Sequence, residues 1–98
     1  MTAPLLWHPA AADEFVGAVV WYEEQRPGLG TAFAAACRSA LALIQDRPEV
    51  FRLVHRDVRR VLLRRFPYAI FYRYREAELL VVAVMHERRD PRRWQERR

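Results

Sequence analysis

The chain has 98 residues, of which 52% are hydrophobic, and its formal net charge at pH 7 is +5. This length allows one packed domain over residues 1–98 and excludes two independent cores. The hydrophobic content, with only six Pro and three Gly, excludes a disordered chain. No stretch approaches the ~20 apolar residues of a transmembrane helix, and no signal segment is apparent. We therefore expect a cytoplasmic protein without membrane association.

Charge is divided unevenly along the chain. Residues 1–50 hold three Arg against six acids, a net charge of −3, whereas residues 51–98 hold fourteen Arg against six acids, a net charge of +8. All seventeen basic residues are Arg. Two interpretations are open, and both can hold together: a GC-rich genome that replaces Lys with Arg, and selection of guanidinium groups that bind phosphates or carboxylates. The asymmetry itself indicates an acidic partner for the second half.

The first half predicts one strand and two helices. Residues 4–7 form a short strand, which ends at His8-Pro9 because proline disfavours helix in the residue before it. A helix follows from Pro9 to about Arg26, and helical spacing predicts a face that packs on the core, with the acids opposite. The expected apolar face comprises Ala12, Phe15, Val16, Val19 and Val20; the polar side carries Asp13, Glu14, Glu23 and Glu24.

A tight reversal at residues 27–30, Pro-Gly-Leu-Gly, joins the first helix to the second. The second helix is predicted from about Thr31 to Arg47, and Pro48 ends it. Its apolar face comprises Phe33, Cys37, Ala40, Leu41 and Ile44. Because the connection is short, the two helices should pack as an antiparallel hairpin.

The second half predicts strands. Residues 52–54 are a weak strand candidate, and residues 58–66 and 68–74 are stronger ones. A hairpin loop at 75–78 leads to residues 79–85, which are apolar on both faces and should form an inner strand. Asp90 and Pro91 predict one further helical turn.

The expected fold is therefore α+β, in the order β-α-α-β-β-β(-β), with an antiparallel sheet covered on one face by the helix hairpin. The other face is expected to carry the arginines.

Three stretches in this order resemble the RelE/ParE toxins of type II toxin–antitoxin systems, and the match covers nearly the whole chain. They are residues 21–30 (WYEEQRPGLG), residues 58–72 (VRRVLLRRFPYAIFY) and residues 84–94 (VMHERRDPRRW). The resemblance implies a toxin, often one that stabilises plasmids, which a neighbouring antitoxin holds inactive with its tail. Operator DNA would be contacted only through the antitoxin. One branch of the family poisons DNA gyrase by binding it, and the other cuts messenger RNA on the ribosome.

A ribonuclease would need a base, a proton donor and cations for the developing phosphorane charge. The candidates for these roles are His86 as the base, Arg60 or Arg64 as the charge clamp, and Tyr68 or Tyr72 as the donor or stacking surface. The alternative is that His86 and residues 88–91 form a structural corner, with an Arg paired to Asp90 and Trp94 packed down.

The gyrase-directed ParE branch is the closer resemblance, because the chain has no Lys and no Tyr after Tyr74. That branch implies binding rather than catalysis, so we expect no enzyme and no cofactor. The expected residues for binding the target or the antitoxin are Arg59, Arg60, Arg64, Arg65, Tyr72, Arg88, Arg89 and Trp94. A plain basic nucleic-acid-binding module is a third hypothesis.

The remaining residues of chemical interest have structural interpretations. His8 and His55 are isolated, and a metal site would need several ligands, so none is expected. The single Cys37 fits a core position in a reducing compartment. Trp7, Trp21 and Tyr22 are interpreted as core or antitoxin-groove residues.

Overall fold

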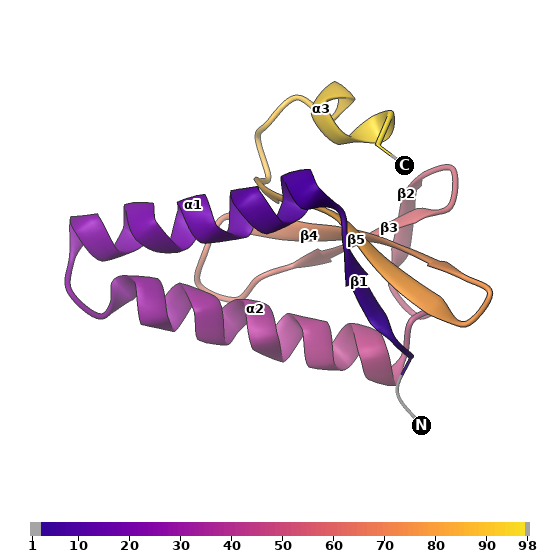
Figure 1. The fold of residues 1–98 in the computed structure, drawn as a ribbon, viewed down its shortest axis with the longest axis horizontal. Helices are drawn as coiled ribbons and strands as arrows, with labels where there is room; N and C mark the ends of the chain where they lie inside the picture. The colour runs from indigo at the N-terminus through magenta and orange to yellow at the C-terminus, as the bar shows by residue number, and fades with distance from the viewer. Residues whose placement is uncertain (1–2, 98) are drawn as a thin grey trace.

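The structure is a computed structural model that describes residues 3–97 (Figure 1). Its elements are β1 (Leu5–Trp7), α1 (Pro9–Gln25), α2 (Leu29–Asp46), β2 (Arg52–His55), β3 (Val58–Leu62), β4 (Tyr68–Arg75), β5 (Glu78–His86) and α3 (Arg92–Gln95). The strands form one sheet in the order β1-β5-β4-β3-β2. The predicted α+β class and element order are confirmed.

The sheet is mixed, although an antiparallel one was expected. The four strands from β2 to β5 form an antiparallel meander, whereas β1 lies parallel to β5, with Leu5 opposite Leu79 and Trp7 opposite Val81. The side-chain pattern of a short strand records which faces are buried and says nothing about the direction of its neighbour. The prediction that the doubly apolar strand is an inner one is confirmed, because β5 lies between β1 and β4.

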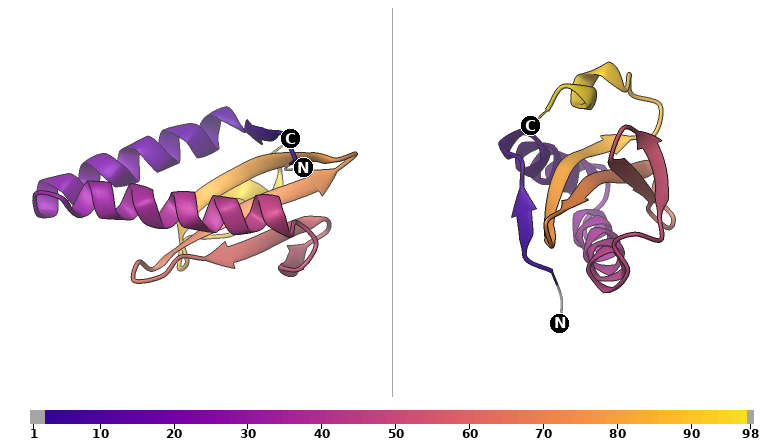
Figure 2. Two further views of the ribbon diagram at one scale, coloured as in Figure 1. Left: turned by 90° about the horizontal axis from the view of Figure 1, so that it is seen from below. Right: turned by 90° about the vertical axis from the view of Figure 1, so that its right-hand side faces the viewer.

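The helices α1 and α2 form the predicted antiparallel hairpin on one face of the sheet (Figure 2). Gly28 lies in the left-handed region with φ 88°, where glycine is favoured, and precedes α2. The Glu23 carboxylate accepts hydrogen bonds from the N–H groups of Gly28 and Gly30 over 2.9 and 3.0 Å. A carboxylate at a helix N-terminus satisfies free donors and is favoured by the helix dipole. Glu23 therefore fixes the turn between the helices.

The buried face of α1 differs from the predicted one. Ala11 and Ala18 are buried, whereas Val16 and Val20, which were expected in the core, are 58% and 51% exposed. Glu14, expected on the polar side, points toward the end of β5. α1 packs closely against both α2 and β5, and small side chains allow that approach. On α2, by contrast, all five predicted apolar residues are buried.

Two apolar cores lie on opposite faces of the sheet. The first lies under the helix hairpin and includes Phe33, Cys37, Ile44, Ile70, Tyr72, Leu79 and Val81. The second core comprises Val58, Ala69, Phe71, Val82, Ala83, Met85 and Trp94. The expectation that the second face is left to the arginines is wrong, because Trp94 of α3 is only 3% exposed and stacks on Phe71 with ring centroids 4.5 Å apart.

The strand β3 is shorter than the predicted strand over residues 58–66. It ends at Leu62, and residues 64–67 form a bend in which Arg65 has φ 69°. The Leu63 N–H donates to the Tyr68 carbonyl, which closes the bend. Arg64 and Arg65 are therefore loop residues, and the prediction that the strand extends through them to residue 66 is wrong.

We expect Cys37 to resist alkylation in the folded protein. Its side chain is 1% exposed in the first core, and burial raises the pKa of the thiol to about 12, so that the reactive thiolate is scarce at pH 8. Mass spectrometry after iodoacetamide treatment should show no adduct in buffer and one adduct in urea. Rapid labelling of the native protein would contradict this packing.

Candidate functional site

Two loops meet at the end of the sheet where β4 begins and β5 ends. Tyr68 lies opposite His86 in the strand register, and the Glu87 N–H donates to the Pro67 carbonyl over 2.9 Å. The loops carry four exposed arginines, which we call the basic corner: Arg64, Arg65, Arg88 and Arg89. None of the four forms an ion pair with another residue of the described range 3–97. Such a group of like charges favours an acidic partner.

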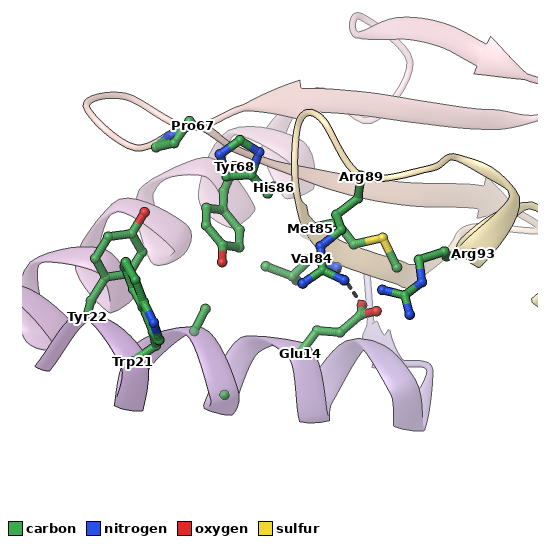
Figure 3. A pocket seen from close by; sticks show the side chains of 12 residues that line it. Glu14, Trp21, Tyr22, Pro67, Tyr68, Val84, Met85, His86, Arg89 and Arg93 are labelled. Carbon is green, nitrogen blue, oxygen red and sulfur yellow. Dashed lines mark hydrogen bonds between the residues drawn. The ribbon is translucent and has the colours of Figure 1, made fainter. Parts of the chain in front are cut away.

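A cleft of about 640 Å³ opens between α1 and this end of the sheet (Figure 3). Its aromatic side is formed by Trp21, Tyr22 and Tyr68, and its cationic side by Arg89 and Arg93. Gly17 and Ala18 of α1 lie between them, and a Cβ atom at Gly17 would have no atom within 4 Å outside its own helix backbone. The cleft therefore has an open, mostly apolar centre next to free cations.

Tyr22 links the cleft to the first core. Its ring stacks on Phe33 at 5.1 Å and meets Tyr68 edge-on at 5.9 Å. Burial raises the pKa of Tyr22, and the neighbouring Tyr68 raises it further. The Tyr22 hydroxyl is thus a neutral hydrogen-bond donor at physiological pH.

His86 is tied to the loop that follows it. Its Nδ1 accepts from the Arg88 N–H over 3.1 Å, and its carbonyl accepts from the Arg89 N–H over 3.0 Å. The ring also packs against Tyr68 at 5.7 Å. These contacts agree with the structural interpretation of His86, since its Nδ1 is engaged in shaping the backbone of the basic corner.

The hypothetical ribonuclease set is brought together only in part, because Arg64 lies in the basic corner at the same end of the sheet as His86 and Tyr68, whereas Arg60 does not. Arg60 lies opposite Phe71 in the register of β3 and β4, on the face covered by Trp94. His86 and Tyr68 contact each other on the other face, beside α1. Residues directly opposite each other on paired strands share a face, so Arg60 is separated from His86 by the sheet. The predicted association of Arg60 with His86 and Tyr68 is therefore wrong.

Three residues expected at the binding surface have structural roles. Arg59 donates to the carbonyls of Glu49 and Phe51 over 3.0 and 2.7 Å, which holds the segment before β2. The buried Tyr72 hydroxyl donates to the Pro48 carbonyl over 2.7 Å, and burial raises the pKa of Tyr72 to about 12. Trp94 lies in the second core. Of the predicted surface, the loops bring together Arg64, Arg65, Arg88 and Arg89.

Asp90 orders the loop after the basic corner. Its carboxylate accepts from the Arg92 N–H over 3.0 Å and from the Arg92 guanidinium over 2.7 Å. The hydrogen bond to the Arg92 side chain, with that to the backbone, lowers the pKa of Asp90 to about 2. The predicted pairing of an Arg with Asp90 is confirmed, and the helix begins one residue later than Pro91.

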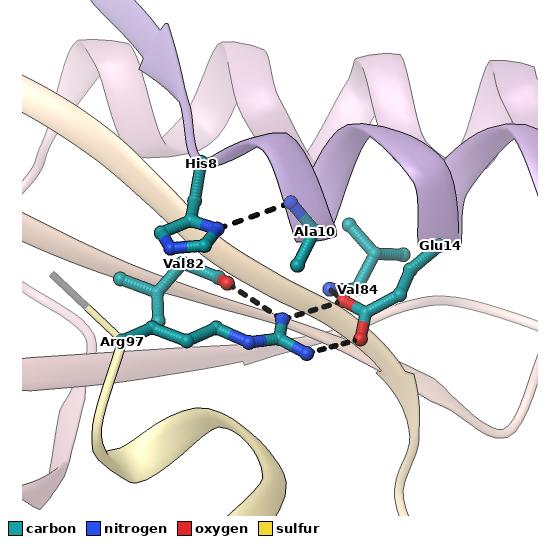
Figure 4. Close-up of polar contacts among 6 residues, drawn as sticks. All are labelled: His8, Ala10, Glu14, Val82, Val84 and Arg97. Carbon is teal, nitrogen blue, oxygen red and sulfur yellow. Dashed lines mark hydrogen bonds and ion pairs between the residues drawn. The ribbon is translucent and has the colours of Figure 1, made fainter.

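Sequence reasoning missed a partly buried clasp between α1 and the C-terminal segment (Figure 4). The Arg97 guanidinium makes two hydrogen bonds to the Glu14 carboxylate, at 2.9 and 2.7 Å, and a third to the Val82 carbonyl at 2.9 Å. Glu14 also accepts from the Val84 N–H over 3.1 Å. These backbone groups lie just past the end of β1, on the edge of β5 that faces away from β4 and has no strand beside it there. We call Glu14 and Arg97 the clasp.

The signal for the clasp was present but weak. Glu14 breaks the small and apolar run of α1 on the side facing β5, but an isolated acid on a helix is usually solvated. At the N-terminus of the same helix, next to the clasp, His8 Nδ1 accepts from the Ala10 N–H over 3.1 Å and caps α1. The expectation that His8 is structural agrees with this contact.

Residues 3–97 contain no group of three His, Cys, Asp or Glu side chains placed to hold a metal ion. No helix in that range is long and apolar enough to cross a membrane.

Comparison with known proteins decides the family. The model of the ParE toxin of the type II toxin–antitoxin system parDE matches residues 5–91. The chain belongs to the ParE toxin family. A solved structure of the chromosomal ParDE TA system from P. aeruginosa has the same fold as this ParE toxin, with a TM-score of 0.71 over 87% of this chain and 96% of that one, at 16% identity. A search of curated protein sequences finds no significant match.

Proposed function

We propose that this ParE-family toxin arrests growth by binding DNA gyrase, and that a cognate antitoxin neutralises it. The observation that carries the proposal is the basic corner, whose four arginines are exposed and form no ion pair within residues 3–97. Unpaired guanidinium groups on a rigid surface are suited to bind carboxylates or phosphates. The corner therefore provides a surface for recognition.

Binding rather than catalysis is favoured by what lies around the corner. The one histidine there uses Nδ1 to hold the Arg88 backbone, and Arg60 lies on the other face of the sheet. A general base needs a substrate proton within hydrogen-bond reach and cations that stabilise the same transition state. The described contacts instead hold the two loops in place: Glu87 to Pro67, and Asp90 to Arg92.

Removing the corner charges tests the proposal. The variant carries Gln at positions 64, 65, 88 and 89, which are exposed, so that its unfolding free energy should change little. We expect the concentration for half-maximal inhibition of gyrase supercoiling to rise roughly 100-fold, because lost charge complementarity weakens binding at such a surface. Normal supercoiling with saturating unmodified toxin would refute the gyrase target.

The single changes Arg89→Gln and Arg38→Gln are the matched pair, because each removes one exposed arginine, the first from the corner and the second from α2. Arg38→Gln should leave the inhibition unchanged, whereas Arg89→Gln should weaken it. Equal losses in these two single variants would show that net charge, and not the corner, governs binding.

A ribosome-dependent endoribonuclease is the second candidate, favoured by the contact of His86 with Tyr68 in the cleft beside Arg89. His86→Asn separates the two candidates, because the amide oxygen of Asn can accept the Arg88 N–H while the side chain cannot act as a base. We expect toxicity to stay within about threefold of the unmodified protein, as for a binding toxin. Loss of toxicity together with loss of codon-linked cuts in a primer-extension map would favour the ribonuclease.

A further inference from the structure

The two end strands of the sheet, β1 and β2, differ in how they are protected from pairing with another chain. β2 carries Arg52 and has a break in register between Leu53 and His55, and both features hinder pairing. β1, with the sequence Leu-Leu-Trp, carries no charge, and its middle residue Leu6 is 49% exposed. We infer that two copies of this chain pair antiparallel through β1 and join their sheets into one.

The backbone of β1 has unused hydrogen-bonding groups on its outer side. The strand bonds to β5 through its even-numbered residues, since the Pro4 carbonyl accepts over 3.0 Å at one end and the His8 N–H donates over 2.9 Å at the other. Because backbone groups alternate in direction along a strand, those of Leu5 and Trp7 point away from β5. They have no hydrogen-bond partner within residues 3–97. We call these groups of Leu5 and Trp7 the free edge.

The free edge is arranged to pair with a second copy of itself. With Leu6 opposite Leu6 in an antiparallel arrangement, Leu5 of each copy lies opposite Trp7 of the other. Each of these two pairs can exchange two hydrogen bonds, since both members direct their N–H and carbonyl groups outward. The Leu6 side chains form the closer, non-hydrogen-bonded pair and cover each other. The arrangement has the two-fold symmetry of most homodimers.

The ends of β1 fit this register and limit its length. The Ala3 carbonyl, which precedes the free edge, already accepts from Gln45 Nε2 over 3.1 Å. In the proposed register Ala3 lies opposite Pro9 of the other copy, which has no N–H to donate. The contact is therefore confined to the three residues of β1 and is small. We expect a weak dimer, with a dissociation constant of about 10–100 µM.

The free edge lies away from the basic corner. β1 pairs with residues 79–81 near the start of β5, whereas the corner follows His86 at its end. Two copies joined antiparallel through β1 hold their corners at opposite ends of the joined sheet, so that the like charges stay apart. The dimer therefore presents two accessible corners, which would raise its avidity for a target with two binding sites.

Sedimentation equilibrium at protein concentrations of about 5–500 µM tests the dimer. The matched variants are Leu6→Lys and Leu53→Lys, because these leucines lie on the two end strands and are 49% and 51% exposed. Leu6→Lys should raise the dissociation constant at least about fivefold, since it places two ammonium groups opposite each other. Leu53→Lys should leave it unchanged. Equal effects of the two changes overturn the inference. A protein that stays monomeric throughout also does so, and leaves the edge to a strand of a different protein.

A mixture of variants tests the register. Leu6→Glu alone should weaken the dimer as Leu6→Lys does. An equimolar mixture of the two should associate at least about fivefold more tightly than either variant alone, because a carboxylate then lies opposite an ammonium group. This recovery is expected only if residue 6 meets residue 6 of the other copy. A mixture that associates no better than its components overturns the proposed register.

Discussion

Trp94→Ala is expected to lower the free energy of unfolding by about 3–5 kcal/mol, the cost of removing a large buried aromatic side chain. The indole is 3% exposed, stacks on Phe71 and meets His55 edge-on at 5.8 Å. Without it, the apolar second face of the sheet would be open to water. Because single domains of this size are stable by only about 5–15 kcal/mol, the change approaches the whole reserve. Urea unfolding followed by far-UV circular dichroism measures it.

Trp21→Ala is the control for this change, since it removes the same side chain from an exposed position and should cost less than about 1 kcal/mol. If Trp94→Ala also lowers the free energy of unfolding by less than about 1 kcal/mol, then α3 does not stabilise the second core. If α3 alone detaches, hydrogen exchange of β4 and β5 amides should stay slow while residues 92–95 exchange rapidly.

The second large effect is expected at the clasp. Glu14→Ala should cost about 3 kcal/mol, because it leaves the guanidinium of Arg97 mostly buried without its counter-ion and the Val84 N–H without an acceptor. The side chains of Arg97 and Glu14 are only 15% and 23% exposed, so water cannot easily replace the lost contact.

A double-mutant cycle separates the pair from its surroundings. Arg97→Ala alone should also destabilise the protein, and the double variant should lose less than the sum of the two single losses by about 1–3 kcal/mol. Strict additivity in urea unfolding would show that the two side chains do not interact in solution. The exposed pair Arg92 and Asp90 serves as the control cycle, in which the two single losses should be nearly additive.

Much of the fold follows from local sequence patterns. The boundaries of α1 and α2 lie within two residues of the prediction, because Pro9, Gly28 and Pro48 act through backbone geometry alone. The inner position of β5 followed from its apolar residues on both faces. Val16 and Val20 were assigned to the core wrongly. Most side chains of α1 are apolar, so helical spacing fits several adjacent faces of the helix as the buried one. The face with Ala11 and Ala18 is the buried one because β5 packs closely against it, which the sequence of α1 does not show.

The candidate site was predictable only in part. The loop arginines Arg64, Arg65, Arg88 and Arg89 were assigned to a binding surface, and the structure brings their two loops together. Arg60 was wrongly placed with His86, because the assignment needs the strand register and the shared faces of neighbouring strands, which composition does not encode. Glu14 and Arg97 escaped notice because 83 residues separate them.

The pairing of β1 with β5 has a consequence for how this chain folds during its synthesis. β1 is made early, but its neighbours Leu79 to Val81 emerge only after both helices and three other strands. Contacts between such distant segments close large loops and slow folding. Until β5 is made, the nascent chain can form the helix hairpin but lacks both the cleft and the basic corner. The surface that we propose for target binding is therefore completed only at the end of synthesis, once β5 and the loop after it have been made.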